Sequence, residues 1–300
     1  MENKRIKYNL LLFWMMLTSL LSIAQHPLTD EVVAQFQKNQ DSFSALVKME
    51  SIMTTDESKE SFVQYTYGFL MKECYKKSPS LDIEKKWRDK AITQFQKAKN
   101  NHPSFSTLDN ITKAEKYIVS TYYNDALIAA RTFQNTNENY PYTLFEKFET
   151  NLNITGIEQP LPALKSQFYK KLAERHYELW EKSDTLLTHP KTCLELYKKV
   201  LVQDPTDCEA LHNTAILYYN IGVNKIKTIA IKADIESLIH IQEEALELFR
   251  QALPFAQSTF QDCPKTTSQF KALMYIQKSL GNDAEFDRLQ MEYKKQFPNE

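Results

Sequence analysis

Two histidines and two cysteines in the second half of the chain have side chains that can ligate a metal ion. His189 precedes Cys193 by four residues, and Cys208 precedes His212 by four. A spacing of four places two side chains on the same face of a helix, and two cysteines with two histidines can hold tetrahedral zinc. Zinc binding is therefore one hypothesis for these residues, and it depends on how the helices that carry them pack.

Other patterns that support catalysis are missing from the sequence. There is no His-Glu-x-x-His, no Gly-x-Ser-x-Gly and no acidic calcium loop. The chain has only 4 glycines, all far apart, whereas phosphate-binding loops need several glycines close together. His102, His176 and His240 stand alone and are interpreted as surface or packing residues. We therefore expect a protein that is not an enzyme and that uses no cofactor.

The charge balance argues against a nucleic-acid partner. The chain has 37 Lys and Arg against 38 Asp and Glu, a formal net charge of −1, whereas nucleic-acid surfaces carry a clustered basic excess. The four cysteines permit disulfides in an exported protein, and the sequence does not choose among their three pairings. They are Cys74, Cys193, Cys208 and Cys263.

Residues 1–24 have the three parts of a secretory signal peptide. Basic residues come first, a mostly apolar and uncharged run covers residues 10–23, and the small residues Ser22 and Ala24 precede a cleavage site. An uncleaved membrane anchor is the alternative, but a membrane span needs about 20 apolar residues. We expect the mature protein to be periplasmic or secreted, with no membrane span after cleavage.

Apolar residues recur at helical spacing throughout the mature chain, and alternating strand patterns are missing. One pattern recurs: a small residue, an aromatic residue four later, a second small residue three later, and a proline five after that. The sets are Ala91, Phe95, Ala98 and Pro103; Cys193, Tyr197, Val200 and Pro205; and, without the proline in place, Ala245, Phe249 and Ala252. The pattern predicts an all-α fold built from helical hairpins.

A linker is predicted at residues 151–162, which contain Gly156, Pro160 and Pro162 and show no helical stripe. It separates degenerate hairpins in residues 26–150 from a C-terminal repeat region in residues 163–300. Three helix pairs are expected in the C-terminal region: 168–180 with 191–202, 209–232 with 234–260, and 267–279 with 284–297.

The recurring pattern is similar to the second helix of tetratricopeptide repeats, whose period is about 34 residues. Ala91 and Cys193 lie 102 residues apart, which is three such periods. The C-terminal region also resembles repeat-containing exported proteins of Bacteroidetes-type bacteria. The matching stretches are AILYYNIG at 215–222, ALPFA at 252–256, and LMYI at 273–276 followed by Leu280 and Gly281. The resemblance implies stacked hairpins in a tetratricopeptide-like (TPR-like) α-solenoid, and an unrelated helical bundle is the alternative.

In this family the first helix of each hairpin lines a concave groove that binds a partner. A solvated helix face is the alternative interpretation of the residues at these positions. The implied groove residues are Glu209, His212, Ile216, Tyr219 and Asn220 in one helix, and Ser268, Lys271, Tyr275 and Lys278 in the next. The same register turns Cys193 inward and His212 toward the groove. The four residues of the zinc hypothesis then diverge, and we expect no metal site.

We expect a non-catalytic scaffold that mediates protein–protein interaction in the cell envelope, because stacked helical hairpins present extended binding surfaces. A repeat protein that binds a small ligand, a peptide or a glycan is the alternative. Its basis is the richness in tyrosine, for example Tyr117, Tyr122, Tyr123, Tyr140 and Tyr142. Rings gathered in one pocket would favour this alternative, and rings spread through the core would argue against it.

Overall fold

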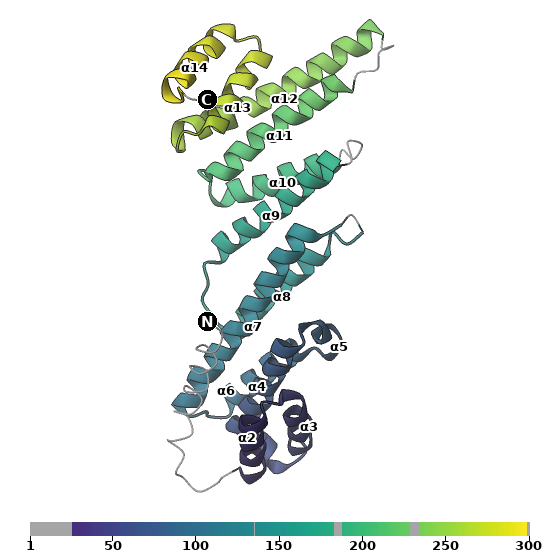
Figure 1. The fold of residues 1–300 in the computed structure, drawn as a ribbon, viewed down its shortest axis with the longest axis vertical. Helices are drawn as coiled ribbons and strands as arrows, with labels where there is room; N and C mark the ends of the chain where they lie inside the picture. Colours follow the sequence, from purple (N-terminus) through teal and green to yellow (C-terminus); the bar gives the residue numbers. More distant parts are fainter. Residues whose placement is uncertain (1–25, 135, 183–187, 229–233, 299–300) are drawn as a thin grey trace. The chain divides into compact units, whose positions relative to one another are not determined.

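The protein is built from α-helices. A computed structural model describes residues 26–134, 136–182, 188–228 and 234–298. These residues form thirteen α-helices and two short 3₁₀ helices, with no strand among them, so the predicted all-α class is confirmed (Figure 1). None of these helices has the length and apolar character needed to cross a bilayer. The predicted signal peptide, residues 1–24, lies outside the described residues.

The chain divides into two compact units. Unit 1 contains the described residues up to Asp125 and Tyr142–Gln159. The division falls within the long helix α7, whose last residues belong to unit 2. The elements of unit 1 are α2 (Pro27–Asn39), α3 (Ser42–Ile52), η1 (Asp56–Lys59), α4 (Ser61–Lys77), η2 (Pro79–Leu81), α5 (Asp82–Lys85), α6 (Trp87–Asn100), and most of α7 (Phe105–Thr132) and α8 (Tyr140–Thr155).

Unit 2 contains Ala126–Pro141 and the described residues from Pro160 onward. Its helices pack in consecutive pairs, α9 with α10, α11 with α12 and α13 with α14, and further contacts join α10 to α11 and α12 to α13. The three helix pairs predicted for this region are confirmed. Their bounds are α9 (Leu161–Lys182), α10 (Thr188–Gln203), α11 (Cys208–Lys227), α12 (Ile235–Asp262), α13 (Thr267–Ser279) and α14 (Asp283–Gln296).

In unit 1 a glycine allows the helices α4 and α6 to approach closely. A Cβ on Gly68 would lie 2.8 Å from the ring of Phe95 and 3.2 Å from the backbone oxygen of Ala91. Real Cβ atoms do not approach the ring this closely, so only glycine fits here without a shift of its neighbours. The first two residues of the recurring pattern therefore serve as the surface against which the preceding helix packs.

The first position of the recurring pattern also lies at a close helix contact twice in unit 2. A Cβ on Gly222 of α11 would lie 2.7 Å from the ring of Phe249 and 3.2 Å from the backbone oxygen of Ala245 in α12. Between α9 and α10, the Cys193 thiol donates a hydrogen bond to the backbone oxygen of Ala173 at 3.2 Å. The helix positions of the recurring pattern are all buried: Ala91, Phe95, Ala98, Cys193, Tyr197, Val200, Ala245, Phe249 and Ala252.

Polar residues fix where the helices of the second and third C-terminal pairs begin. The carboxylates of Asp207 and Asp234 accept hydrogen bonds from backbone N–H groups three residues later, at 2.8 and 2.7 Å, and cap α11 and α12. Thr266 and Gln269 form a reciprocal capping box at the start of α13. Each cap supplies partners to N–H groups that the helix itself leaves unpaired, typically worth about 1 kcal/mol.

The structure corrects the predicted linker at 151–162. Helix α8 continues to Thr155 and α9 begins at Leu161, so only Gly156–Pro160 is non-helical. The buried stripe here is partly polar, because the Asn151 amide donates to the backbone oxygen of Lys147 at 2.9 Å and the Thr155 hydroxyl to that of Asn151 at 2.7 Å. A search for apolar residues misses such a stripe. Gly156 ends the helix with φ 69°, a conformation that glycine adopts readily.

A disulfide joins the two ends of the α11–α12 hairpin. Cys208 at the start of α11 is bonded to Cys263, which directly follows α12, over a sequence separation of 55. Cys74 and Cys193 are free and buried. The fold thus forms one bridge and leaves the other two cysteines as thiols, so none of the three complete pairings is made.

Candidate functional site

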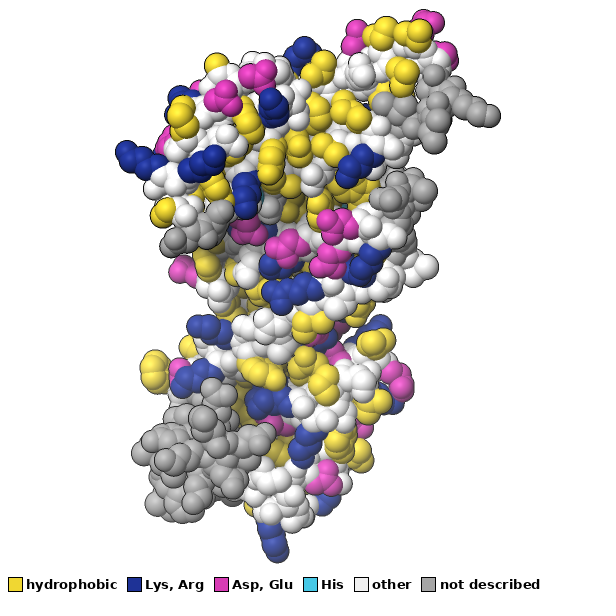
Figure 2. All heavy atoms as spheres, turned by 45° about the horizontal axis from the view of Figure 1, so that its top comes forward, with side chains coloured by type: hydrophobic (Ala, Val, Ile, Leu, Met, Phe, Trp, Pro, Cys, Tyr) yellow, Lys and Arg dark blue, Asp and Glu magenta, His cyan; other side chains and the backbone are white. Residues whose placement is uncertain are grey.

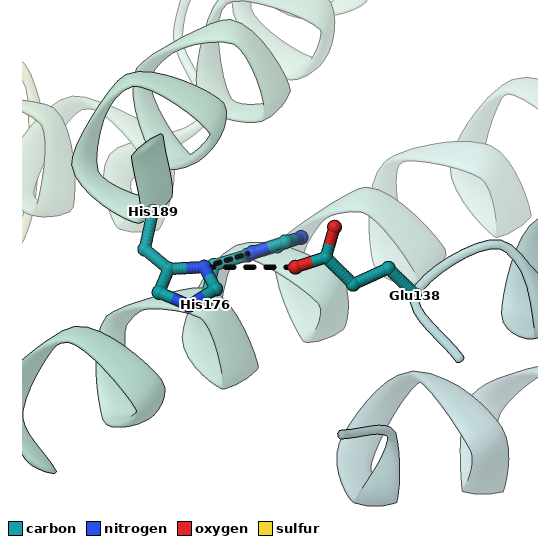
Figure 3. Close-up of side chains that lie close together, drawn as sticks. All are labelled: Glu138, His176 and His189. Carbon is teal, nitrogen blue, oxygen red and sulfur yellow. Dashed lines mark hydrogen bonds and ion pairs between the residues drawn. The ribbon is translucent and has the colours of Figure 1, made fainter. Parts of the chain in front are cut away.

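A carboxylate and two imidazoles come together in unit 2. Glu138, His176 and His189, called here the histidine cluster, each have one potential ligand atom within 4.8 Å of those of the other two. The Nδ1 atoms of His176 and His189 are 3.0 Å apart, and Nδ1 of His189 is 3.8 Å from Oε1 of Glu138. Both contacts meet at the same ring nitrogen of His189 (Figure 3).

Three elements of the unit position these side chains. His176 lies on the buried face of α9, and His189 lies in the first turn of α10, the partner of α9 in the same hairpin. Pro190 follows His189, and proline is well tolerated in the first turn of a helix because the N–H it lacks has no partner there. Glu138 belongs to the turn between α7 and α8.

The surroundings hold the imidazoles more firmly than the carboxylate. His176 and His189 are each 3% exposed, whereas the Glu138 side chain is 42% exposed. The ring of His176 packs on Phe133, with centroids 4.9 Å apart. Arg175 Nε donates to the backbone oxygen of Phe133 at 2.9 Å, which anchors the chain just before the turn that carries Glu138.

Burial controls the charge of the histidine cluster. Desolvation lowers the pKa of His176 to about 4, and the neighbouring His189 contributes to the lowering, so His176 is neutral at pH 7. Among the described residues, the buried Nε2 of His189 has no hydrogen-bond partner. Since buried polar atoms normally have partners, the polar groups of the two rings are only partly satisfied by the described protein atoms.

His176 is a packing residue, as predicted, since its buried ring contacts Phe133. The prediction that it stands alone was wrong, because it also contacts His189. The contact between Ala173 and Cys193 sets the register of the α9–α10 hairpin. His176 follows Ala173 by three residues, and His189 precedes Cys193 by four. Because the two helices are antiparallel, these steps bring the two histidines to facing positions. The predicted helix pair and its small residues therefore contained a signal for this approach. No such signal existed for Glu138, which comes from a turn between other helices.

The residues of the original zinc hypothesis do not form a metal site. Cys208 is bonded to Cys263, and the Cys193 thiol donates to a backbone oxygen within its own hairpin. Nε2 of His212 lies 3.0 Å from the hydroxyl of Ser268 in α13. Of the four, His189 alone belongs to the histidine cluster, and its neighbours there are residues that the hypothesis did not include.

Three of the five groove residues predicted in α11 contact the first helices of the neighbouring pairs. Three polar contacts join α11 to α9 or α13: Glu209 Oε2 to Lys170 Nζ at 2.8 Å, the Asn220 amide to the Tyr177 hydroxyl at 2.8 Å, and His212 to Ser268 as above. Ile216 and Tyr219 are half-buried, and the Tyr219 ring packs on Phe249 with centroids 5.4 Å apart.

The groove residues predicted in α13 lie on two sides of that helix. Ser268 faces α11, whereas Lys278 pairs with Asp283 of α14 at 2.7 Å. Lys271 Nζ lies 5.7 Å from the centre of the Tyr293 ring, also in α14. Tyr275 is 50% exposed. The structure therefore places the two lysines beside α14, with Tyr275 presented to solvent.

A cavity of about 610 Å³ opens where the start of α9 meets the end of α10 and the start of α11. Lys170 lies in its wall and pairs with Asp207 at 3.0 Å and with Glu209 at 2.8 Å. Glu209 is the predicted groove residue that lines this cavity. The wall also includes Ser166 and Gln203, so it offers positively charged, negatively charged and neutral polar groups.

Two of the tyrosines behind the ligand-binding alternative, Tyr122 and Tyr123, have different roles in unit 1. Tyr122 is buried, and the guanidinium carbon of Arg88 lies 4.0 Å from the centre of its ring. Tyr123 packs against Phe145 and Phe148, with centroids 6.2 and 5.1 Å apart. These two rings contribute to the core of unit 1, which removes part of the reason for that alternative.

Comparison with known proteins assigns no family to the chain. No family model matches the sequence, and no curated protein matches it. The residues themselves therefore point to function through two features of unit 2: the histidine cluster, and the linked first helices α9, α11 and α13.

Proposed function

We propose that the protein is a non-catalytic helical repeat scaffold of the tetratricopeptide type, which binds an extended segment of a partner protein. The close contact of small residues supports this proposal. It joins α4 to α6, α9 to α10 and α11 to α12, and each time it involves the first position of the recurring pattern. A repeated unit that buries the same positions each time is what a stack of hairpins requires.

The observation that carries the proposal is the direct linkage of first helices. Tyr177 of α9 accepts a hydrogen bond from Asn220 of α11, and His212 of α11 contacts Ser268 of α13. When the first helix of each pair touches the first helix of the next, these helices form one continuous face, here called the first-helix face. A face that extends over several helices suits an extended peptide, because the peptide can contact each helix in turn.

The chemistry of the first-helix face suits a peptide with apolar and acidic side chains. Tyr275 presents an exposed ring, Ile216 is half-buried, and Lys271 adds positive charge at the edge. Figure 2 shows hydrophobic side chains, in yellow, gathered on the surface over the C-terminal hairpins, with basic and acidic side chains around them. Aromatic anchors with a polar rim are typical of protein-binding surfaces.

Export to the periplasm or beyond the cell is part of the proposal. Its basis is the signal-like pattern of residues 1–24. The Cys208–Cys263 disulfide supports it, because disulfides persist mainly in oxidising compartments. The two remaining cysteines are buried, which protects free thiols from oxidation in such a compartment.

Site-specific photo-cross-linking in the native cell envelope tests the proposal. A photoreactive amino acid replaces Tyr275 or Ile216 on the first-helix face, and mass spectrometry identifies what is captured. We expect one protein partner at both positions. Tyr275→Ala, which removes an exposed ring without opening the core, should reduce capture at position 216.

Exposed positions on second helices are the matched controls. Met291 of α14 and Val202 of α10 are 68% and 75% exposed, so a photoreactive group is as accessible there as at Tyr275. We expect no capture of the same partner at these positions. Equal capture at first and second helices, or capture that Tyr275→Ala leaves unchanged, would contradict a binding face formed by the first helices.

A further inference from the structure

We propose that Glu138, His176 and His189 bind a divalent zinc ion, a property that does not depend on the scaffold function proposed above. Two imidazole nitrogens and one carboxylate oxygen are a ligand set that zinc uses, with the fourth tetrahedral position left for water or another ligand. The three residues come from a turn and two helices of the same unit.

The distances are close to those of a zinc site. Bonds of about 2.0–2.1 Å at tetrahedral angles place neighbouring ligand atoms roughly 3.3 Å apart. The Nδ1 atoms of His176 and His189 are 3.0 Å apart, and Nδ1 of His189 is 3.8 Å from Glu138 Oε1. The imidazoles therefore need to separate by a few tenths of an ångström, and the carboxylate needs to move inward.

The larger of these movements falls on Glu138, the residue that is freest to move. The Glu138 side chain is half-exposed and comes from a turn, so its rotamers are free to bring an oxygen toward the imidazoles. The two rings are held by the packing of α9 on α10 and by the contact of His176 with Phe133. Two preformed ligands and one adjustable ligand lower the cost of ordering the site.

The approach of the two Nδ1 atoms allows one hydrogen bond between the rings, whereas a metal ion would engage both nitrogens. Two ring nitrogens 3.0 Å apart share one proton, so one donates and the other accepts. A metal ion accepts the lone pairs of both nitrogens together and adds an attraction for the Glu138 carboxylate. The positive charge of the neighbouring Arg175 is offset by Glu178, whose Oε2 lies 2.8 Å from its Nη1 atom, so it opposes a bound cation less.

Titration of the untagged full chain with ZnSO₄, after removal of metals by a chelator, tests the proposal. Competition with a chromophoric chelator gives the stoichiometry and the affinity. We expect one zinc ion per chain, and at least about tenfold weaker binding in Glu138→Gln, because a lost ligand should cost no less than a lost outer-shell partner. Glu138→Gln changes a half-exposed turn residue, so the fold should be retained.

His240→Gln is the matched control. His240 Nε2 lies 3.5 Å from Glu244 Oε1 in α12, and the histidine is 70% exposed. It is a histidine–carboxylate pair in the same unit, but it lacks a second imidazole. We expect zinc affinity in His240→Gln to equal that of the unchanged protein.

Nitrogen-15 NMR of the histidine rings identifies the ligands without any substitution. Addition of one equivalent of zinc should shift the Nδ1 resonances of His176 and His189 and leave those of His212 and His240 in place. Zinc bound with unshifted Nδ1 resonances of the cluster, wild-type affinity in Glu138→Gln, or no stoichiometric binding would each overturn the proposal.

Discussion

The buried ion pairs of unit 1 differ from the histidine cluster of unit 2 in whether opposite charges are matched. In unit 1, Arg88 lies 2.6 Å from Asp82 and 2.7 Å from Asp125, and Asp82 is buried with it. In unit 2, two buried imidazoles face each other and share a single, half-exposed carboxylate. A matched buried charge serves the fold, whereas the imidazole pair leaves Nε2 of His189 without a hydrogen-bond partner among the described residues.

The units nevertheless share the way in which their hairpins pack. Gly68 meets Ala91 and Phe95 in unit 1, and Gly222 meets Ala245 and Phe249 in unit 2, with nearly equal distances. The difference between the units therefore lies in the polar side chains added to a common packing scheme. Substitutions can separate the effect of the polar side chains from that of the common packing. Four such predictions run from the largest expected effect to the smallest.

Arg88→Met should destabilise unit 1 strongly. The carboxylate of Asp82 would remain buried without its counter-charge, which typically costs about 3–5 kcal/mol. The free energy of unfolding in urea measures the loss. Arg288→Met is the control, because Arg288 is exposed and pairs with Glu285 and Glu292 on the surface of α14. Its loss should cost about 0–1 kcal/mol, and equal losses would show that burial of the Arg88 pairs is unimportant.

Gly68→Ala and Gly222→Ala should destabilise their units by similar amounts. Overpacking costs about 1–3 kcal/mol, and the higher helix propensity of alanine offsets up to about 1 kcal/mol of this. Thermal unfolding measures each loss. Adding Phe249→Leu to Gly222→Ala should partly restore stability, because it removes the ring atom that the new Cβ would meet. A loss of stability for one of the two single variants and none for the other would show that the two glycine contacts are not equivalent.

Glu115→Gln in unit 1 should change how stability depends on pH. Burial raises the pKa of Glu115, and the nearby Lys99, 2.6 Å away, opposes this only in part. The folded state therefore holds the proton more tightly than the unfolded state. As pH rises above about 4.5 and through the raised pKa, wild-type protein should lose stability relative to the variant. Urea unfolding of both proteins between about pH 4 and pH 7 measures the difference.

Glu285→Gln is the control of opposite sign for the pH experiment. The pKa of Glu285 is lowered, chiefly by its hydrogen bond from Arg288. Its contribution to stability is present above the ordinary pKa and is lost as pH falls through the lowered one. Wild-type protein should therefore gain stability relative to this variant as pH rises. The same trend in both variants would argue against opposite environments for the two carboxylates.

The smallest effect is expected for the double variant His176→Leu with His189→Phe in metal-free protein. Replacement of both hydrogen-bonding partners by apolar groups should change the free energy of unfolding by less than about 1 kcal/mol. His189→Phe alone leaves Nδ1 of His176 buried without its partner and should cost about 1–3 kcal/mol. Urea unfolding of the single and double variants measures both. A double variant as damaged as Arg88→Met would mean that the cluster, like the ion pairs, serves the fold.

Much of the fold could be predicted from local patterns. The bounds predicted for the first helix of the last pair, 267–279, are those of α13, since a capping box precedes it and Gly281 follows it. The end of α8 was missed because polar residues such as Asn151 and Thr155 carry its buried stripe. The predicted groove residues were distributed among contacts with α9, α13 and α14, which depend on the packing of neighbouring pairs.

The sequence by itself determined that the described residues are helical and that the helix positions of the recurring pattern are buried, because helix periodicity is encoded within a few turns. Only the tertiary structure decided that Cys208 pairs with Cys263 and that Glu138 approaches His176 and His189. These contacts join residues far apart in the chain. Their distances depend on how far one helix is shifted along another and where a turn ends, and periodicity within a helix does not specify either quantity.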